Sequence, residues 1–173
     1  MIARIYGEAY HEAKMSEPTR LTVLKALTSE IERRAGLEGC VFRGRDWFGP
    51  NNGDTVPFIT IMEDYEMRNQ DPLQSQDGRA RVIDLPLVII GFDEEDSDNP
   101  TDPATRLMYR VMDAIRGVLK DGRLPEGESD ILGLGRTVDR IQIGGGTVYP
   151  ANVDLSSTVA FFSLRASIRF VED

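Results

Sequence analysis

The stretch TVAFFSLRASIRFV, residues 158–171, decides the fold class because its side chains alternate between apolar and polar. One side of this predicted strand carries Ala160, Phe162, Leu164, Ala166, Ile168 and Phe170. The opposite side carries Ser163, Arg165, Ser167 and Arg169. A period of two with one apolar side is typical of a strand in a sheet that is covered on one face only.

Two segments with apolar residues at helical spacing provide the cover for that face. The first is predicted over residues 18–35, begins at Pro18 and ends before Gly36; its stripe is Leu21, Leu24, Leu27 and Ile31. The second is predicted over residues 103–121, with Asp102 as the cap, Pro103 in the first turn and Gly122 as the stop. Its stripe is Ala104, Leu107, Met108, Val111, Met112, Ile115 and Leu119.

The other strands are predicted at Cys40–Gly44, Val56–Glu63, Arg81–Phe92 and Thr137–Ile143. Pro86 lies within the third of these. Because proline donates no hydrogen bond to a neighbouring strand, we expect that strand at a sheet edge or at a bulge. The glycine-rich stretches GLGRTV (133–138) and GGG (144–146) predict turns or close backbone approach, and residues 144–157 read as a turn-rich connection.

The order helix, strands, helix, strands predicts an α+β fold, with a mostly antiparallel sheet packed against two helices. We expect a single domain over residues 18–173. Residues 1–17 are predicted to form an N-terminal arm or a short helix. Residues 64–80 and 92–102 contain few apolar side chains at any regular period, and we expect them to be exposed loops.

The chain is acidic, with a formal net charge of −9 and a pI near 4.7. The segment from Phe92 to Pro103 supplies six of the nine net negative charges and contains no basic residue. This balance argues against a surface that grips nucleic-acid phosphates. The predicted second helix carries basic residues off its apolar stripe (Arg106, Arg110, Arg116 and Lys120), which we expect to be solvated and paired with the acidic loop.

The sequence contains no set of residues with the spacing of a known catalytic or metal site. With only Cys40 and His11, neither a disulfide nor a Cys/His zinc site forms within one chain, and we expect Cys40 to be a buried, inert thiol. The acidic run DEEDSDNPTD (93–102) suggests a hard-cation site, but it does not match the calcium-loop pattern. We therefore predict no enzymatic activity, no cofactor and no metal, with a metal-dependent hydrolase using residues 93–102 as a distant alternative.

The apolar run LPLVII (85–90) is too short to cross a bilayer, and the N-terminal residues are too charged for a signal peptide. We expect a soluble protein made in a cytoplasm.

The best candidates for partner contact lie in VFRGRDWFGP, residues 41–50. Arg43, Arg45, Trp47 and Phe48 belong to residue types enriched at protein interfaces. The alternative is that Trp47 and Phe48 fold back and close one end of the core. In the 64–80 loop, Tyr65 and Arg68 are further candidates for partner contact.

Taken in order, these features resemble the tail terminator (tail-completion) proteins of long-tailed bacteriophages. The resemblance covers residues 18–171. It includes the first helix, VFRGR (41–45), PFITI (57–61), LPLVIIGF (85–92), the acidic loop, the second helix with its core LMYRVMDAI (107–115), and β-structure to the end.

The resemblance implies a structural virion protein of the tail and neck, made in the host cytoplasm. It implies a homo-oligomeric, six-fold ring that caps the tail tube and joins it to the head connector, so that the tail tube protein and the neck proteins are partners. DNA would pass through the ring without specific binding, and the ring would contact no membrane. The alternative within assembly proteins is a head-completion or neck adaptor protein.

Overall fold

The computed structural model describes residues 17–45, 55–64, 73–74, 81–125, 128–151 and 159–172. In chain order the elements are α1 (Thr19–Ala35), β1 (Val41–Arg43), β2 (Phe58–Glu63), β3 (Leu73–Gln74), β4 (Arg81–Phe92), α2 (Asp102–Asp121), the short 3-10 turns η3 (Ile131–Gly133) and η4 (Gly135–Thr137), β5 (Val138–Tyr149) and β6 (Phe161–Glu172). The predicted order of helices and strands is confirmed.

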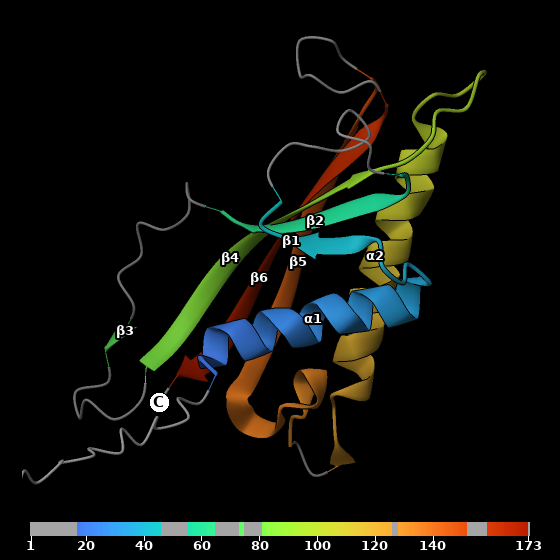
Figure 1. The fold of residues 1–173 in the computed structure, drawn as a ribbon. Coiled ribbons are helices and arrows are strands. Elements are labelled where there is room, and N and C mark those ends of the chain that lie inside the picture. Colours follow the sequence, from blue (N-terminus) through green and yellow to red (C-terminus); the bar gives the residue numbers. More distant parts are fainter. Residues whose placement is uncertain are drawn as a thin grey trace, which may run out of the picture.

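The strands form one sheet in the order β1-β2-β4-β6-β5, and β3 also pairs with β4 (Figure 1). The β1–β2 pair is parallel, and every other pair in the described sheet is antiparallel. The longest register joins β4 and β6 over their full length, from Arg81 opposite Glu172 to Phe92 opposite Phe161. The α+β fold class with a mostly antiparallel sheet is therefore confirmed.

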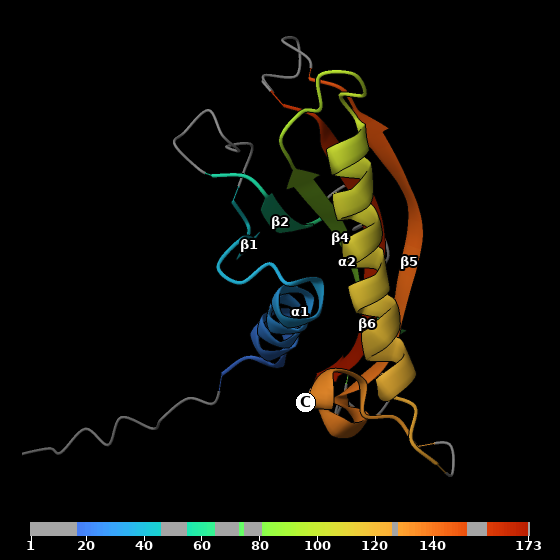
Figure 2. The same cartoon turned by 90° about the vertical axis from the view of Figure 1, so that its right-hand side faces the viewer.

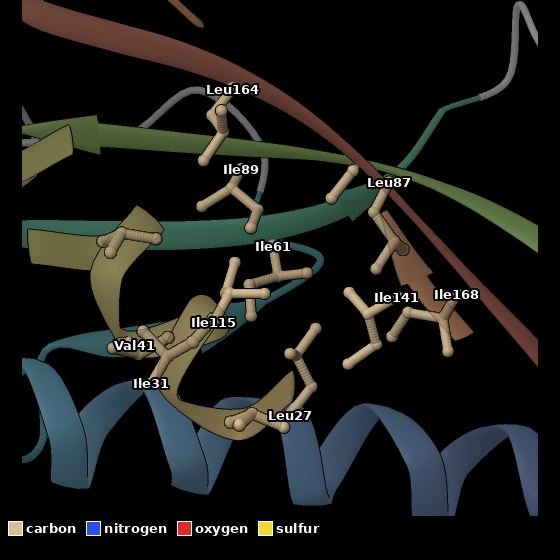
Figure 3. Packing of buried hydrophobic residues seen from close by; sticks show 14 of the residues in the cluster. Leu27, Ile31, Val41, Ile61, Leu87, Ile89, Ile115, Ile141, Leu164 and Ile168 are labelled. Carbon is tan, nitrogen blue, oxygen red and sulfur yellow. The ribbon is translucent and has the colours of Figure 1, made fainter. Parts of the chain in front are cut away.

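The core lies between the sheet and the two helices, as Figures 1 and 2 show. Leu27 and Ile31 of α1 and Ile115 of α2 point into the same space as Leu87 of β4 and Ile168 of β6 (Figure 3). Each of these five side chains is at most 1% exposed. The apolar side of the last strand is buried from Ala160 to Phe170, as its alternation predicts. Burial of this apolar surface is the main driving force for the fold.

The buried stripe of α1 differs from its prediction by a small rotation. Leu27 and Ile31 are buried, but in the first turns the buried apolar residue is Val23, whereas Leu24 is partly buried and Leu21 is 38% exposed. The helix ends at Gly36, whose left-handed backbone (φ 62°) allows its N–H to donate to the Glu32 carbonyl. A glycine stop is therefore correct, whereas the first turn of the stripe is not.

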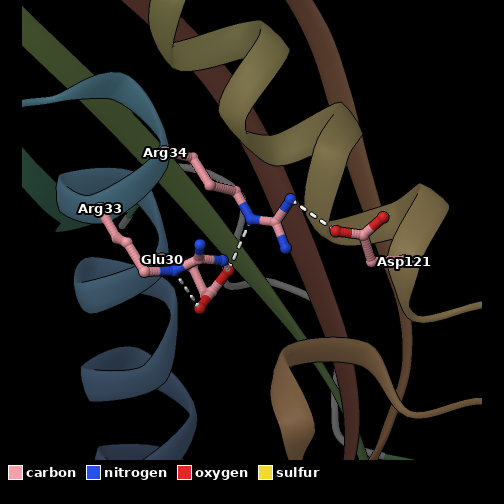
Figure 4. A network of polar contacts seen from close by, with 4 residues as sticks. All are labelled: Glu30, Arg33, Arg34 and Asp121. Carbon is pink, nitrogen blue, oxygen red and sulfur yellow. Dashed lines mark hydrogen bonds and ion pairs between the residues drawn. The ribbon is translucent and has the colours of Figure 1, made fainter.

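Charged side chains also join the two helices (Figure 4). The Arg34 Nε lies 2.6 Å from a carboxylate oxygen of Glu30, and its Nη1 lies 2.8 Å from one of Asp121. Arg110 of α2 donates to the carbonyl oxygens of Ala35 and Gly36 at the end of α1. Because these carbonyls have no partner within their own helix, Arg110 satisfies groups that every helix end leaves open.

The predicted pairing of the α2 basic residues with the acidic loop is largely wrong. Only Arg106 lies near that segment, with its Nη1 3.7 Å from the Asp102 carboxylate. Arg110 binds α1, and Arg116 pairs with Asp113 one turn away at 2.8 Å. Arg116 thus has a partner on its own helix surface, and Arg110 is held by the carbonyl groups at the end of α1.

Pro86 does not place its strand at the edge of the sheet. β4 lies between β2 and β6, and Pro86 is opposite Ser167 of β6. Its carbonyl accepts a hydrogen bond from the Asp64 N–H (3.0 Å), immediately beyond the end of β2. Because the N and C=O of one residue point to the same side of an antiparallel strand, the missing N–H faces the place where β2 ends. A proline within a central strand is tolerated there.

The glycine run 144–146 is not a turn. It lies inside β5, which extends to Tyr149, and the register with β6 shifts between Ile143 and Gly146. A Cβ on Gly146 would lie 2.4 Å from the Met108 Sδ of α2, and one on Gly144 would lie 3.3 Å from the Arg165 carbonyl oxygen. Close approach of neighbouring backbone and helix was predicted correctly, whereas the end of the strand was placed too early.

Several predictions fall outside the described residues. These are the arm or helix at residues 1–17, apart from Glu17, the contact candidates Trp47, Phe48, Tyr65 and Arg68, and the 64–80 loop apart from Asp64 and β3. The acidic loop between β4 and α2 is described, and its residues from Glu94 to Pro100 are exposed as predicted.

Candidate partner-contact surface

The side of the sheet turned away from α1 and α2 is called here the open face. Alternation along each strand places there the residues that do not enter the helix-covered core, such as Val88 of β4 and Ser167 of β6. This face has two parts. One end carries a row of aromatic rings, and the middle and opposite end carry polar and charged side chains.

The aromatic row crosses all five strands of the sheet order, with one ring from each. Its members, in order from β1 to β5, are Phe42, Phe58, Phe92, Phe161 and Tyr149. Neighbouring ring centroids lie 4.9, 6.0, 5.7 and 4.9 Å apart. The three central rings are buried, while Tyr149 at the β5 edge is 37% exposed. These spacings suit aromatic attraction, so the row ties the strands together at this end of the sheet.

Arg45 lies at the β1 end of the row. Its guanidinium carbon is 4.6 Å from the centre of the Phe42 ring and 5.2 Å from that of Phe58. The backbone reaches this position because Gly44 adopts a positive φ of 63° and donates its N–H to the Ile61 carbonyl (2.9 Å). The Thr60 hydroxyl donates to the Arg45 carbonyl oxygen at 2.9 Å. Arg45 is thus held against the protein's own aromatic rings, and it is half-buried rather than fully displayed.

The structure separates Arg43 from Arg45. Val41 and Arg43 share one side of β1, whereas Phe42 points to the open face with the other rings. Arg43 is exposed, and its charge contributes, after Lys25 and Thr22, to a lowered pKa of Glu17. The two arginines of VFRGR therefore do not form one contact patch.

The charged part of the open face centres on β4, β5 and β6. Arg169 binds the Asp84 carboxylate through two nitrogen atoms at 3.0 and 2.8 Å, across the β4–β6 pair. The Arg169 hydrogen bond is the main reason that the pKa of Asp84 lies below its usual value, and the charge of Arg140 adds to it. Arg165 is 63% exposed and lies 3.9 Å from Asp64, whose side chain is 8% exposed.

A shallow groove of about 380 Å³ lies next to these charges, at the bulge of β5. It is lined by Gln142, Ile143, Gly144, Arg165, Ala166 and Ser167. The Gln142 amide, the Ser167 hydroxyl and the Arg165 guanidinium border a space that is otherwise lined by apolar groups of Ile143, Gly144 and Ala166. These polar groups can bind a polar or anionic partner, and the six lining residues offer no nucleophile activated by a neighbouring base.

The acidic loop uses its own carboxylates to hold its shape, and Asp93 accepts a hydrogen bond from the Glu94 N–H at 2.9 Å. Asp96 accepts hydrogen bonds from the N–H groups of Asp98 (3.0 Å) and Asn99 (2.9 Å), which lower its pKa. Glu95 accepts one from the Ala151 N–H at 3.2 Å, beyond the end of β5. In the described part of the chain, no three or more His, Cys, Asp or Glu side chains are grouped as a metal site requires.

Two other predictions concern the chemistry of the chain. Cys40 is half-buried rather than buried; its thiol lies 3.6 Å from the Glu38 carbonyl oxygen and packs against the core. Among the described helices, none combines the length and the apolar composition that a bilayer-spanning helix needs.

In a comparison with known proteins, neither a family model nor a curated protein matches the chain.

Sequence reasoning missed the aromatic row and the groove. Both depend on strand register, which brings together residues as distant as Phe42 and Phe161. One signal was present: Phe161 and Phe162 are adjacent, so one of them must point away from the helix-covered core. The groove had no such signal, because the glycines that open it were read as a turn.

Proposed function

We propose that the protein is a structural subunit that associates with copies of itself into a closed ring, and that this ring terminates a phage tail tube and joins it to the head connector. The support for the ring is physical, and the support for the tail is the resemblance described above. DNA would pass through the ring without specific binding.

The observation that carries the proposal is a sheet whose two described helices lie on the same face (Figure 2). The other face presents a half-exposed aromatic edge, a groove bordered by polar side chains, and exposed arginines. A subunit with different surfaces on its two sides suits head-to-tail contacts, which close into rings when the rotation between neighbours permits. The acidic balance adds support, since a ring of such subunits repels DNA phosphates and lets DNA slide.

The test of self-association is native mass spectrometry of the purified full chain, with electron microscopy of the same sample over a range of concentrations. Closed rings, with six copies expected from the resemblance, support the proposal. Monomers at every concentration, together with absence of the protein from rings at the end of tails, would overturn it.

The tail role has a separate test, which is deletion of the gene in its phage. Tails of uncontrolled length are expected for a terminator. Full heads that lack tails, beside normal free tails, would instead identify a neck adaptor. Phosphoester hydrolysis that a chelator abolishes would identify the metal-dependent hydrolase, for which the described residues group no metal ligands.

A further inference from the structure

The groove on the open face borders cations that the described part of the chain does not fully neutralise. Arg165 lines the groove, is 63% exposed, and has its carboxylate partner at 3.9 Å, near the limit of an ion pair. Arg140 of β5 is exposed on the same face, and no ion pair joins it to the other described residues. The Gln142 amide and the Ser167 hydroxyl add hydrogen-bond donors beside them. A carboxylate-bearing segment matches this surface in charge and in hydrogen bonding.

The chain carries such a segment at a different place. In the loop between β4 and α2, Glu94 and Asp98 are exposed, and their carboxylates accept no hydrogen bond from the other described residues. Asp96 and Glu95 hold the loop in shape by accepting hydrogen bonds from backbone N–H groups. The Glu94 and Asp98 carboxylates are therefore presented on a preformed turn. Preformed segments lose less conformational entropy when they bind.

The loop does not reach the groove of its own subunit. It leaves the end of β4 and leads to α2, which lies on the helix-covered face (Figure 2). Arg140 lies opposite Arg169, which pairs with Asp84, eight residues before Phe92. At a rise of about 3.3 Å per residue, Arg140 is about 26 Å along the strand from the start of the loop, whereas Arg165, opposite Val88, is about 13 Å from it. Among the described residues of one subunit, no hydrogen bond or ion pair joins Glu94 or Asp98 to either arginine.

We propose that the β5–β6 groove, with Arg165 and Arg140, receives the acidic loop of a second copy of this chain, with Glu94 and Asp98 as its contacts. The proposal rests on the self-association proposed above and names the two surfaces that meet. Because the groove and the loop are different surfaces, each copy both gives and receives one contact. This is the head-to-tail geometry from which a ring closes.

The first experiment reverses the charge of each surface in the full chain. One variant is Arg140→Glu with Arg165→Glu, and the other is Glu94→Lys with Asp98→Lys. Sedimentation velocity should show that the concentration for half-assembly rises at least about tenfold in each, because like charges then face one another. The control for the groove variant is Arg116→Glu with Arg123→Glu, which makes the same change of net charge at exposed positions elsewhere and should assemble like the wild type.

The decisive experiment mixes the two reversed variants. The acidic groove of one then faces the basic loop of the other, so the mixture should assemble within about threefold of the wild-type concentration although neither variant does alone. The comparison requires that both variants are folded, and thermal unfolding of each variant checks this beforehand. If the groove variant fails to fold, the loop variant alone carries the test, since the exposed Glu94 and Asp98 side chains make no hydrogen bond or ion pair with the other described residues.

The outcomes separate this inference from the proposed function. The groove-to-loop contact is overturned if the wild type forms rings and both reversed variants assemble unchanged, or if mixing the variants gives no rescue. Either result leaves the proposal of a ring intact. A wild-type chain that is monomeric at every concentration would overturn the ring itself. Assembly of the wild type that is weakened by raising the salt from 0.05 to 0.5 M is expected, because exposed ion pairs are screened.

Discussion

Gly91 of β4 lies directly beneath the ring of Phe162: a Cβ on Gly91 would be 2.2 Å from the Phe162 Cε1 and 2.7 Å from the Ile59 Cδ1. Both neighbours are fully buried, so neither side chain has room to move aside. The absence of a side chain at position 91 is therefore a packing requirement for three adjacent strands.

The first prediction is that Gly91→Ala lowers the free energy of unfolding by about 1–3 kcal/mol, the usual cost of overpacking a core. Urea denaturation monitored by circular dichroism measures it. Gly145→Ala is the matched control, because a Cβ at that position meets nothing within 4 Å. Equal stability of the two variants would show that the strands shift easily to accept the methyl group.

The second prediction concerns Arg45. Its guanidinium packs on Phe42 and Phe58, so Arg45→Ala should lower the free energy of unfolding by about 0.5–1 kcal/mol, the range for a partly exposed cation over a ring. Arg43→Ala, at an exposed position on the other side of β1, should change it by less than about 0.5 kcal/mol. Thermal unfolding compares the two. If residues 41–50 also form a subunit contact, Arg45→Ala should remain folded and fail to form rings in native mass spectrometry.

The third prediction is that stability declines in acid. The Arg169 hydrogen bond lowers the pKa of Asp84 from its ordinary 3.8, and the Arg33 and Arg34 hydrogen bonds lower that of Glu30 from 4.5. A carboxyl group with a lower pKa in the folded state stabilises the fold above its unfolded pKa, and this contribution is lost as the pH falls through the folded value. The melting temperature should therefore fall below about pH 4.5.

Asp84→Asn tests one part of this pH dependence. The variant should be less stable than the wild type at pH 7, by less than about 1 kcal/mol because the pair is partly solvated. Its loss of stability between pH 4 and pH 2 should be smaller, since it has one fewer carboxylate to protonate. Parallel melting curves of variant and wild type across that range would contradict the assignment of the lowered pKa to the Arg169 pair.

The fourth prediction is that the chain does not bind duplex DNA with submicromolar affinity at 0.15 M salt. The cations of the open face are few, and the chain as a whole carries a net charge of −9. Counterion release therefore offers little driving force. Fluorescence anisotropy with a labelled duplex, repeated over a salt titration, measures the affinity. Tight binding with a steep salt dependence would contradict a ring through which DNA slides.

Local patterns in the sequence were enough to predict both helices and the last strand. The apolar stripe of α2 and the alternation of β6 repeat over many residues, so single exceptions such as the exposed Leu21 in α1 do not obscure the signal. The predictions of a sheet edge at Pro86 and of a turn at residues 144–146 were wrong because the rules behind them consider only neighbouring residues. The structural roles of these residues depend on where β2 ends and on how close α2 comes.

The candidate surface was much less predictable. Of the six predicted contact residues, the structure describes Arg43 and Arg45, and it places them on opposite sides of β1. The groove combines residues about 20 positions apart in sequence, such as Gly144 and Arg165. Such a combination follows from the β5–β6 register, and a shift of one residue would turn every side chain to the other face.

The two offsets in the β5 ladder have a consequence for the outer edge of the sheet. β5 is a long strand at the edge of the sheet. A second chain aligned along its outer backbone would lose its hydrogen-bond register at the Val138–Arg140 and Ile143–Gly146 irregularities. Interrupted edges of this kind oppose the stacking of chains into fibrils. The β5 edge is therefore a poor template for backbone pairing with a second chain, and a contact made along it depends on its side chains.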